Sequence, residues 1–389
     1  MMRAVDRARR ALVPAVVMLT VTHKCQLACA HCYQANHDSE DLSTEELIAL
    51  MDELVQMGTL DVVFTGGEAL LRKDIFTLMA EARKRAFAVT LFSNGGPINA
   101  ATARKLRELR VMRVEISLHG SHAATHDGFV GRQGSFDRAV RAIELLDDEG
   151  VPVLVKSSIV RCNIHEIFEL QKLFAARPRV QFVSDPTLFT KDDGTSVMHE
   201  RATPEMMEQH HAERFSTMSS ADLANARTLL SEPPSEAEVD QRHPCGAGRT
   251  LAAVQPNGDV LACIHIPTRP LGNLRQTRFS EMWLDSEPVR ALRQLTLQKF
   301  TECQGCEYRH VCAKCPALSF AESGKLEGHS KQTCETTKAY WGAIKKRLAE
   351  DGTRAAQGAE VRTLDRVAPR VPGCDDTTPR RFALRVVGG

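Results

Sequence analysis

Three cysteines near the N-terminus have the spacing of ligands to a metal cluster. Cys25, Cys29 and Cys32 form a C-x3-C-x2-C run directly after an apolar segment typical of a β-strand. Three thiolates on a tight loop can hold three irons of a four-iron cluster, and the fourth iron then lacks a protein ligand. An open iron can bind a small molecule, as the open position of a catalytic zinc site does. A zinc site completed by His31 or His23 is the alternative interpretation.

A second group of cysteines lies in the C-terminal half. It comprises Cys245, Cys263, Cys303, Cys306, Cys312, Cys315 and Cys334. Two C-x2-C pairs within this group are compatible with a structural zinc fold. However, five residues between the pairs is short for a zinc ribbon, and three further cysteines would be left over. Of the two isolated cysteines, Cys162 is predicted to be a small buried residue, and Cys374 lies in a polar tail without an expected role.

Polar residues follow or interrupt several predicted strands. Gly66-Gly67-Glu68 ends the second strand, and Ser93-Asn94 ends the third. In the fourth strand Glu115 and Ser117 alternate with apolar residues, and in the fifth Lys156 and Ser158 do the same. Because side chains alternate between the two faces of a strand, we expect these four side chains to face the interior of a barrel. Ordinary polar lining is the alternative role for each.

The elements that position these residues alternate along the chain. Six strands are predicted over residues 16–21, 62–64, 88–92, 111–118, 152–160 and 180–184, with helices between them. Capping boxes are predicted at Ser43 with Glu46 and at Asn163 with Glu166. Short connections between such units predict a parallel sheet, whose functional residues gather at the carboxyl ends of the strands.

The fold class is therefore α/β. Six strand–helix units fall short of the eight of a closed barrel, which favours a partial (β/α)6 TIM-type barrel, although a doubly wound sheet stays open. We assign an N-terminal tail to residues 1–12, the barrel to 13–195 and a helical bridge to 196–242. A cysteine-rich domain follows at 243–340, and a helix with a polar tail at 341–389.

Composition excludes several classes of protein. The chain has 389 residues and a net charge of +1, so no polybasic surface indicates nucleic acid or anionic lipid. Its longest apolar run, residues 11–21, contains Pro14 and is too short for a membrane span. No convincing export signal precedes the cysteines, so we expect a cytoplasmic protein that uses its thiols for metal rather than for disulfides.

The N-terminal run, followed by Tyr33, resembles the signature of the radical S-adenosylmethionine (SAM) superfamily. The resemblance implies a [4Fe-4S] cluster held by Cys25, Cys29 and Cys32, with its open iron bound by SAM. It further implies SAM contacts from Tyr33 and from the Gly66-Gly67-Glu68 motif, whose backbone and carboxylate hold the methionine amino group in the family. Further contacts would come from the polar residues of strands three to five: Ser93, Asn94, Glu115, Ser117, Lys156 and Ser158.

The C-terminal pattern resembles the SPASM domain, which carries auxiliary iron–sulfur clusters. Position by position, Cys303, Cys306, Cys312 and Cys334 would hold an outer cluster. Cys245, Cys263 and Cys315 would hold an inner one. Seven thiolates do not fill eight sites, so one or two auxiliary clusters are expected. The inner one would keep an open iron, be smaller, or recruit a ligand such as His243 or His265.

The resemblance implies an enzyme that cleaves SAM reductively to a 5′-deoxyadenosyl radical. The leading hypothesis is modification of a ribosomally synthesised peptide by thioether, C–C or oxidative chemistry. The alternatives are tetrapyrrole side-chain chemistry, as in haem biosynthesis, and a zinc-stabilised interaction protein without activity. Expected partners are the peptide, a one-electron reductant of the flavodoxin or ferredoxin type and, since no leader-binding domain precedes the barrel, a separate leader-recognition protein.

Overall fold

The computed structural model describes residues 11–36 and 40–356, which form a nine-stranded sheet with flanking helices. The strands lie in the order β6-β5-β4-β3-β2-β1-β7-β8-β9. Their bounds are β1 Val16–Thr20, β2 Asp61–Thr65, β3 Ala88–Ser93, β4 Arg113–Ser117, β5 Val153–Ser158, β6 Val180–Asp185, β7 Leu251–Val254, β8 Asp259–Leu261 and β9 Gly272–Asn273.

The first six strands form the predicted partial barrel. Each pairs in parallel with its neighbour in the chain, so the strand order runs from β6 to β1 without a reversal. A doubly wound sheet would change direction at a switch point, and this sheet does not. All six carboxyl ends consequently lie at one edge, where the polar motifs of the sequence also end.

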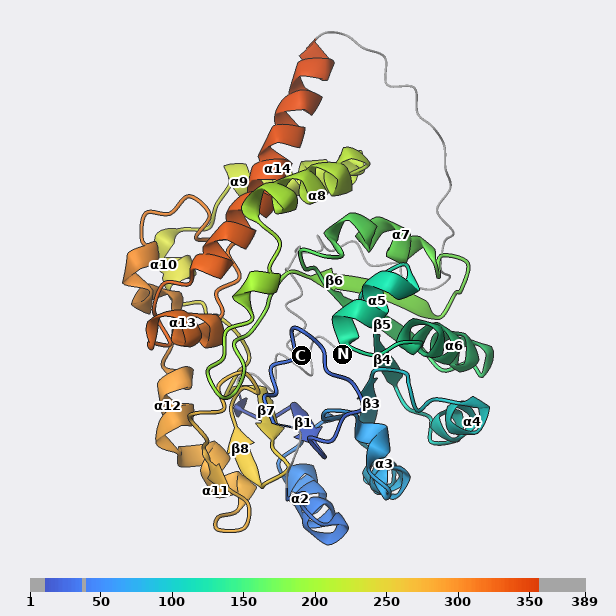
Figure 1. Ribbon diagram of the computed structural model, residues 1–389. Helices are drawn as coiled ribbons and strands as arrows, with labels where there is room; N and C mark the ends of the chain where they lie inside the picture. The colour runs from blue at the N-terminus through green and yellow to red at the C-terminus, as the bar shows by residue number, and fades with distance from the viewer. Residues whose placement is uncertain (1–10, 37–39, 357–389) are drawn as a thin grey trace.

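The helices of the barrel cover the outer face of the sheet (Figure 1). They are α2 Thr44–Gln56, α3 Ile75–Lys84, α4 Ala100–Glu108, α5 Ala123–Val130, α6 Ser135–Asp148 and α7 Ile167–Lys172. Three helices lie in the predicted bridge: α8 Pro204–Ser216, α9 Ser220–Ser231 and α10 Glu236–Asp240. The remaining helices are α11 Phe279–Asp285, α12 Glu287–Arg293, α13 Pro316–Ser323 and α14 Lys331–Ala356.

Helix α2 shows how local sequence signals produced these elements. The Ser43 side chain accepts from the backbone N–H of Glu46, and the Glu46 carboxylate accepts from the Ser43 N–H, as the capping box predicted. Its apolar residues at helical spacing, among them Leu47, Met51 and Leu54, are buried against the sheet. Burial of this stripe, rather than propensity alone, holds the helix in place.

The second predicted capping box is wrong. The amide of Asn163 donates to the backbone oxygens of His119 (2.9 Å) and Ser158 (2.8 Å), at the ends of β4 and β5. The Glu166 carboxylate accepts from Ser121 N–H (2.7 Å) and from the Thr125 hydroxyl. Both side chains therefore hold the loop after β4 instead of capping a helix, because that loop lies within reach in the folded barrel.

Three other expectations change or fall outside the described residues. Helix α5 was not predicted, since its sequence has no apolar stripe at helical spacing. Cys162 is exposed rather than buried, because it lies in the turn that follows β5. The tail beyond residue 356, including Cys374, and most of the N-terminal tail lie outside the described residues.

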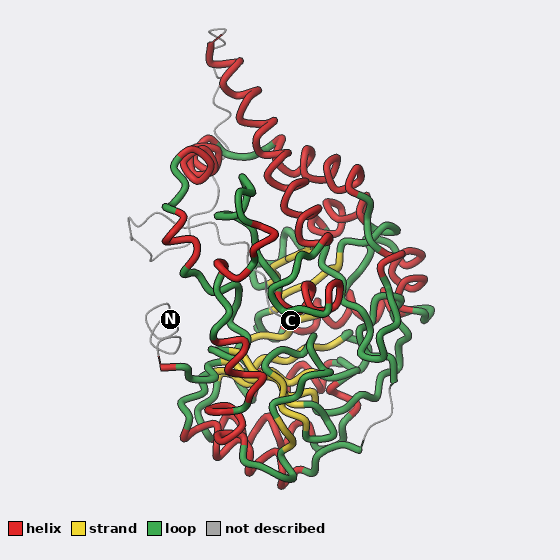
Figure 2. Tube along the Cα trace, turned by 90° about the vertical axis from the view of Figure 1, so that its left-hand side faces the viewer, coloured by secondary structure: helices red, strands yellow, loops and turns green. Residues whose placement is uncertain are grey.

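The cysteine-rich region joins the barrel through its first strand. Strand β7 pairs in parallel with β1, and β8 and β9 extend the sheet antiparallel. The Glu53 carboxylate of α2 accepts from the backbone N–H groups of Phe279 (3.1 Å) and Ser280 (2.9 Å) at the start of α11. Figure 2 shows the last helix, α14, projecting beyond the body of the molecule. The auxiliary region is thus docked on the barrel rather than tethered to it.

Across the described ranges, no helix combines the length and the apolar character that a membrane span requires.

One pH-dependent contribution to stability follows from Asp61, at the start of β2. Burial raises the pKa of this carboxyl to about 6, although Arg113 nearby favours its ionised form. Because the folded pKa lies above the unfolded one, the stability Asp61 contributes is present below about pH 4 and is lost as pH rises through 6.

We therefore expect Asp61→Asn to be more stable than the wild type by about 2 kcal/mol at pH 8 and by about half as much at pH 5. Anaerobic urea denaturation at the two pH values measures the difference. An equal effect of Asp61→Asn at both pH values would contradict the assignment.

Candidate functional site

The N-terminal cysteine loop forms one wall of a cavity of about 250 Å³ at the carboxyl ends of the strands. The thiols of Cys25, Cys29 and Cys32 all line this cavity. The loop is tight, since the backbone N–H of Cys32 donates to the Cys29 oxygen (3.1 Å). Its middle is paired with the end of α5 through Ala28 N–H and Ala30 N–H.

The three thiols require a strong positive charge if they are to ionise together. Burial raises the pKa of each thiol, to about 12 for Cys29, where the charges of Cys32 and Cys25 add to the effect. Thiolates bind iron, and a cationic cluster offsets both the cost of burying the thiolates and their mutual repulsion. The donor set therefore fits a three-thiolate iron–sulfur cluster with its open iron facing the cavity.

The glycine pair after β2 lies directly against this loop. The backbone N–H of Gly67 donates to Thr22 O (2.9 Å), and that of Glu68 donates to Lys24 O (2.9 Å). A Cβ on Gly67 would lie 2.4 Å from His23 O and 2.8 Å from the Cβ of Cys25. A Cβ on Gly66 would lie 2.3 Å from Thr22 O. Only glycine permits this approach, and both glycines line the cavity.

The Glu68 carboxylate faces β3 rather than the cavity. It accepts from the Ser93 hydroxyl (3.0 Å), the Asn94 N–H (2.8 Å) and the Leu70 N–H (3.1 Å). Burial raises its pKa to about 7 against these hydrogen bonds. The geometry therefore does not favour the expected direct contact between this carboxylate and a ligand. Glu68 instead fixes the end of β3.

Ser93 and Asn94 reach the cavity as predicted. The Asn94 amide donates to Cys25 Sγ (3.8 Å) and accepts from Gln26 Nε2 (2.8 Å). The carboxyl end of β3 is thereby connected to the cysteine loop. A hydrogen bond to a ligand thiolate also stabilises its ionised form.

The four polar residues of β4 and β5 do not share one role. Ser117 and Lys156 line the cavity. Glu115 is buried beneath them and forms ion pairs with Lys156 (3.2 Å) and Arg113 (2.6 Å). Ser158 lies outside the lining, and its backbone N–H donates to His119 Nδ1 (3.2 Å). Two of the four residues thus line the cavity, whereas Glu115 and Ser158 do not.

Four histidines line the cavity, namely His31, His119, His126 and His265, and nothing in the sequence indicated His126. The backbone N–H of His119 donates to His126 Nδ1 (3.0 Å), which places the proton of a neutral His126 on Nε2. Burial lowers the pKa of His31, His119 and His126, so all three rings are neutral. Among the described residues, buried His126 Nε2 and His31 Nδ1 have no hydrogen-bond partner, which fits a polar ligand in the cavity.

The cysteine-rich region supplies the opposite wall through Ile264 and His265. The His265 ring stacks on Phe189 with centroids 3.5 Å apart and meets the Tyr33 ring edge-on at 5.2 Å. Tyr33 lines the cavity as predicted, and its backbone oxygen accepts from Asp192 N–H (2.8 Å). His265, one of two candidate ligands of an inner cluster, thus lies in the wall of the first site.

The outer cysteines, Cys303, Cys306, Cys312 and Cys334, surround a polar centre. The Lys314 ammonium donates to Cys303 Sγ (2.9 Å). The Thr337 hydroxyl lies 3.2 Å from Cys312 Sγ, and His329 Nε2 lies 3.3 Å from Cys334 Sγ. The backbone N–H of Cys306 donates to Cys303 O (3.4 Å).

The inner cysteines, Cys245, Cys263 and Cys315, interact electrostatically with one another. Although Cys245 as a whole is exposed, burial of its thiol raises the pKa to about 11. Burial also raises the pKa of the Cys263 and Cys315 thiols. His243, the other candidate for a fourth ligand, has its Nδ1 2.9 Å from the Leu295 oxygen.

The zinc alternative finds no support in the geometry. In the described part of the chain, no three His, Cys, Asp or Glu side chains converge on one point as ligands of a single ion would. A zinc ion needs its ligand atoms within about 2.0–2.3 Å of one centre.

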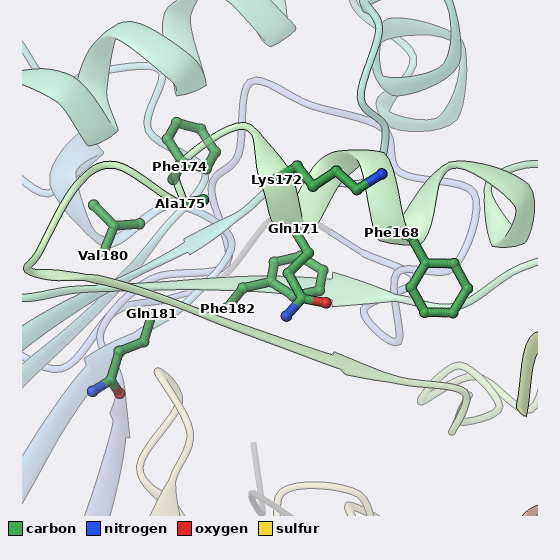
Figure 3. A pocket seen from close by; sticks show the side chains of 8 residues that line it. All are labelled: Phe168, Gln171, Lys172, Phe174, Ala175, Val180, Gln181 and Phe182. Carbon is green, nitrogen blue, oxygen red and sulfur yellow. The ribbon is translucent and has the colours of Figure 1, made fainter. Parts of the chain in front are cut away.

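A second cavity, of about 450 Å³, lies away from these centres, between α7 and the edge strand β6. Figure 3 shows Phe168, Gln171 and Lys172 on its helix side, and Val180, Gln181 and Phe182 on its strand side. None of the residues that the sequence singled out lies among its lining. The chemistry therefore belongs to the cavity at the carboxyl ends of the strands.

Two family models match the chain. Residues 19–161 match the radical SAM superfamily, and residues 245–316 match SPASM, an iron–sulfur cluster-binding domain. The first match covers β1 to the end of β5, with the cysteine loop. The second begins at Cys245 and includes six of the seven auxiliary cysteines, since it ends at residue 316 and Cys334 lies beyond it.

Relatives of two functions are similar to the chain. It is 30% identical to an AdoMet-dependent heme synthase of Oleidesulfovibrio alaskensis, over 78% of this chain and 83% of that protein. It is 29% identical to the mycofactocin maturase MftC of Mycolicibacterium smegmatis, over 88% and 87%. Streptococcus suis SuiB bound to its precursor peptide SuiA has the same fold, with a TM-score of 0.66, 16% identity and coverage of 86% and 79%.

Gly67 offers a test of the contact between the glycine pair and the cysteine loop. We expect Gly67→Ala to push the loop away and to lower the iron and sulfide bound at Cys25, Cys29 and Cys32. The measurement is iron and sulfide content after anaerobic reconstitution of chains that lack the auxiliary cysteines. Gly128→Ala is the matched control, because a Cβ there meets nothing within 4 Å. Equal iron content in the two variants would contradict the proposed constraint.

Proposed function

Because the chain belongs to the radical SAM superfamily and carries a SPASM domain, we propose that it modifies a ribosomally synthesised peptide at an unactivated C–H bond. As a member of this superfamily it is an enzyme whose cofactors are SAM and iron–sulfur clusters. When bound, these cofactors supply one-electron cleavage of SAM, which yields methionine and a 5′-deoxyadenosyl radical that abstracts hydrogen from the substrate.

Each residue of the site has a distinct part in this proposal. Cys25, Cys29 and Cys32 hold the cluster, and the backbone at Gly66-Gly67 receives the amino-acid end of SAM beside it. Ser117 and Lys156 supply polar contacts on the opposite side of the cavity. Glu68 positions Ser93 and Asn94 through the hydrogen bonds described above. Tyr33 and His265 close the cavity with aromatic surface, which keeps water away from a reactive intermediate.

The charge of the cavity is the observation that supports a peptide, rather than a tetrapyrrole, as the substrate. Among the described residues that line it, Lys156 is the only lysine or arginine, and Glu115 already pairs with it. The lining histidines are neutral. A tetrapyrrole with several carboxylates would require several cations, because unpaired buried charge is costly. A peptide segment needs hydrogen bonds and apolar contacts, which this lining offers.

Tetrapyrrole chemistry is the second candidate, favoured by the similarity to the heme synthase.

The proposal includes two protein partners. A flavodoxin or ferredoxin would supply the electron that SAM cleavage consumes. A separate leader-recognition protein would present the peptide. The similarity to MftC supports a maturase, and SuiB shows that this fold accommodates a precursor peptide in another enzyme.

Cluster-dependent SAM cleavage is tested by removing one thiolate. We expect Cys29→Ala to lower the rate of 5′-deoxyadenosine formation, with dithionite as reductant, at least a hundredfold, because the cluster loses one of its three ligands. Liquid chromatography of quenched anaerobic reactions measures this product. Cys162→Ala, an exposed cysteine outside all three groups, should retain the wild-type rate. Equal rates in the two variants would contradict the assignment of the first cluster.

The substrate class is tested with two probes. We expect a peptide encoded by a short reading frame beside this gene to raise 5′-deoxyadenosine formation at least tenfold and to change in mass. Iron-coproporphyrin III, a carboxylate-rich tetrapyrrole, should neither bind nor stimulate. Absorbance titration and mass spectrometry give the two readouts. Turnover of the tetrapyrrole with an unchanged peptide would overturn the proposal in favour of the second candidate.

A further inference from the structure

The two sets of auxiliary cysteines lie in contrasting electrostatic environments. A cation and polar side chains lie beside the outer thiols, whereas the charges that act on the inner thiols are those of Asp185 and of the neighbouring cysteines. Backbone N–H groups are the donors to the inner thiols: Ala247 to Cys245, His265 to Cys263, and Leu318 and Ala317 to Cys315. Two auxiliary centres within one small domain therefore differ in the polarity around their sulfurs.

Lys314 is the strongest of the outer contacts. Its ammonium donates to Cys303 Sγ at 2.9 Å, and it is half-buried. It also interacts electrostatically with the thiols of Cys312 and Cys334. A single cation thus serves three of the four outer cysteines. Thr337 and His329 add a polar atom to Cys312 and Cys334, at 3.2 and 3.3 Å.

The position of Lys314 in the chain explains this contact. It lies between Cys312 of the outer set and Cys315 of the inner set, immediately before α13. Its backbone N–H donates to Cys312 O (3.1 Å), and this turn directs the side chain back over Cys303. Glycine at this position would leave that side of the outer centre without a cation.

Physical chemistry gives the consequence for a bound cluster. Reduction adds one negative charge, so a nearby cation and hydrogen bonds to the sulfurs favour the reduced form and raise the reduction potential. The effect is strong where water is partly excluded, since charges there interact through a lower dielectric. At the inner site the negative charge of Asp185 acts on Cys315 and disfavours an additional electron, which opposes the effect of the backbone hydrogen bonds to the sulfurs.

We propose that Lys314 is a positioning residue that sets the reduction potential of the outer auxiliary cluster above that of the inner one. The outer cluster is then the centre on which an electron resides when the domain holds one. This inference rests on the proposed ligand assignment of the outer cysteines. It does not depend on the class of substrate.

The test is an EPR-monitored redox titration of full-length, anaerobically reconstituted protein. Chains with Cys25, Cys29 and Cys32 all replaced by alanine remove the signal of the first cluster. At the potential where the wild-type outer cluster is half reduced, we expect Lys314→Gln to lower the ratio of reduced to oxidised cluster by roughly tenfold, the effect of losing a charged hydrogen bond. Lys314→Arg should restore most of that ratio.

Lys338→Gln is the matched control. Lys338 is exposed on α14 and interacts with Cys334 through its charge. Removing it should change the ratio much less than Lys314→Gln does. Unchanged iron and sulfide with an unchanged titration in Lys314→Gln would overturn the inference. Replacing a single outer cysteine by alanine, by contrast, measures whether iron is lost. That experiment tests only the ligand assignment.

A second measurement detects the contact of the Lys314 side chain directly in the wild-type protein. With ¹⁵N-labelled lysine, pulsed EPR of the reduced outer cluster should show a ¹⁵N coupling that disappears in Lys314→Arg. Absence of that coupling in the wild type would equally overturn the inference, because a nitrogen in hydrogen-bond contact with a ligand sulfur must couple to the electron spin.

Discussion

The close approach of two backbone segments determines the geometry of the site. The chain after β2 passes so near the cysteine loop that Gly67 leaves no space for a side chain, and its N–H donates to Thr22 O. This contact holds the cysteine loop at a fixed height above the sheet. It also places the glycine pair beside the thiols, so that both line one cavity where a small molecule can reach them. The neighbouring strand ends are then arranged around that pair of loops.

Electrostatics decides what the cavity can hold. Three buried thiols favour a cationic cluster, and the cavity beside them is lined by neutral histidines and one lysine that is already paired. The Glu68 carboxylate supports the site without lining the cavity. It is buried, yet it satisfies the N–H of Asn94 and the hydroxyl of Ser93, so it stabilises the end of β3 while those residues face the cavity.

The cysteine-rich region is part of the site because β7 continues the barrel sheet next to β1. That pairing brings Ile264 and His265 over the mouth of the cavity, opposite the first cysteine loop. The Glu53 carboxylate, by accepting from the first N–H groups of α11, adds a second point of attachment. A change in the position of the auxiliary centres would therefore alter the wall of the cavity as well.

The sequence by itself determined the six parallel strands, the capping box at Ser43 and the grouping of the cysteines, because strand alternation, capping and ligand spacing are local properties. Only the tertiary structure decided the direction of the Glu68 carboxylate, the depth of Glu115 beneath Lys156 and the place of His126 in the wall. These depend on contacts between residues far apart in the chain. For the same reason the role of Asn163 was misassigned, since its partners, His119 and Ser158, reach it only in the folded barrel.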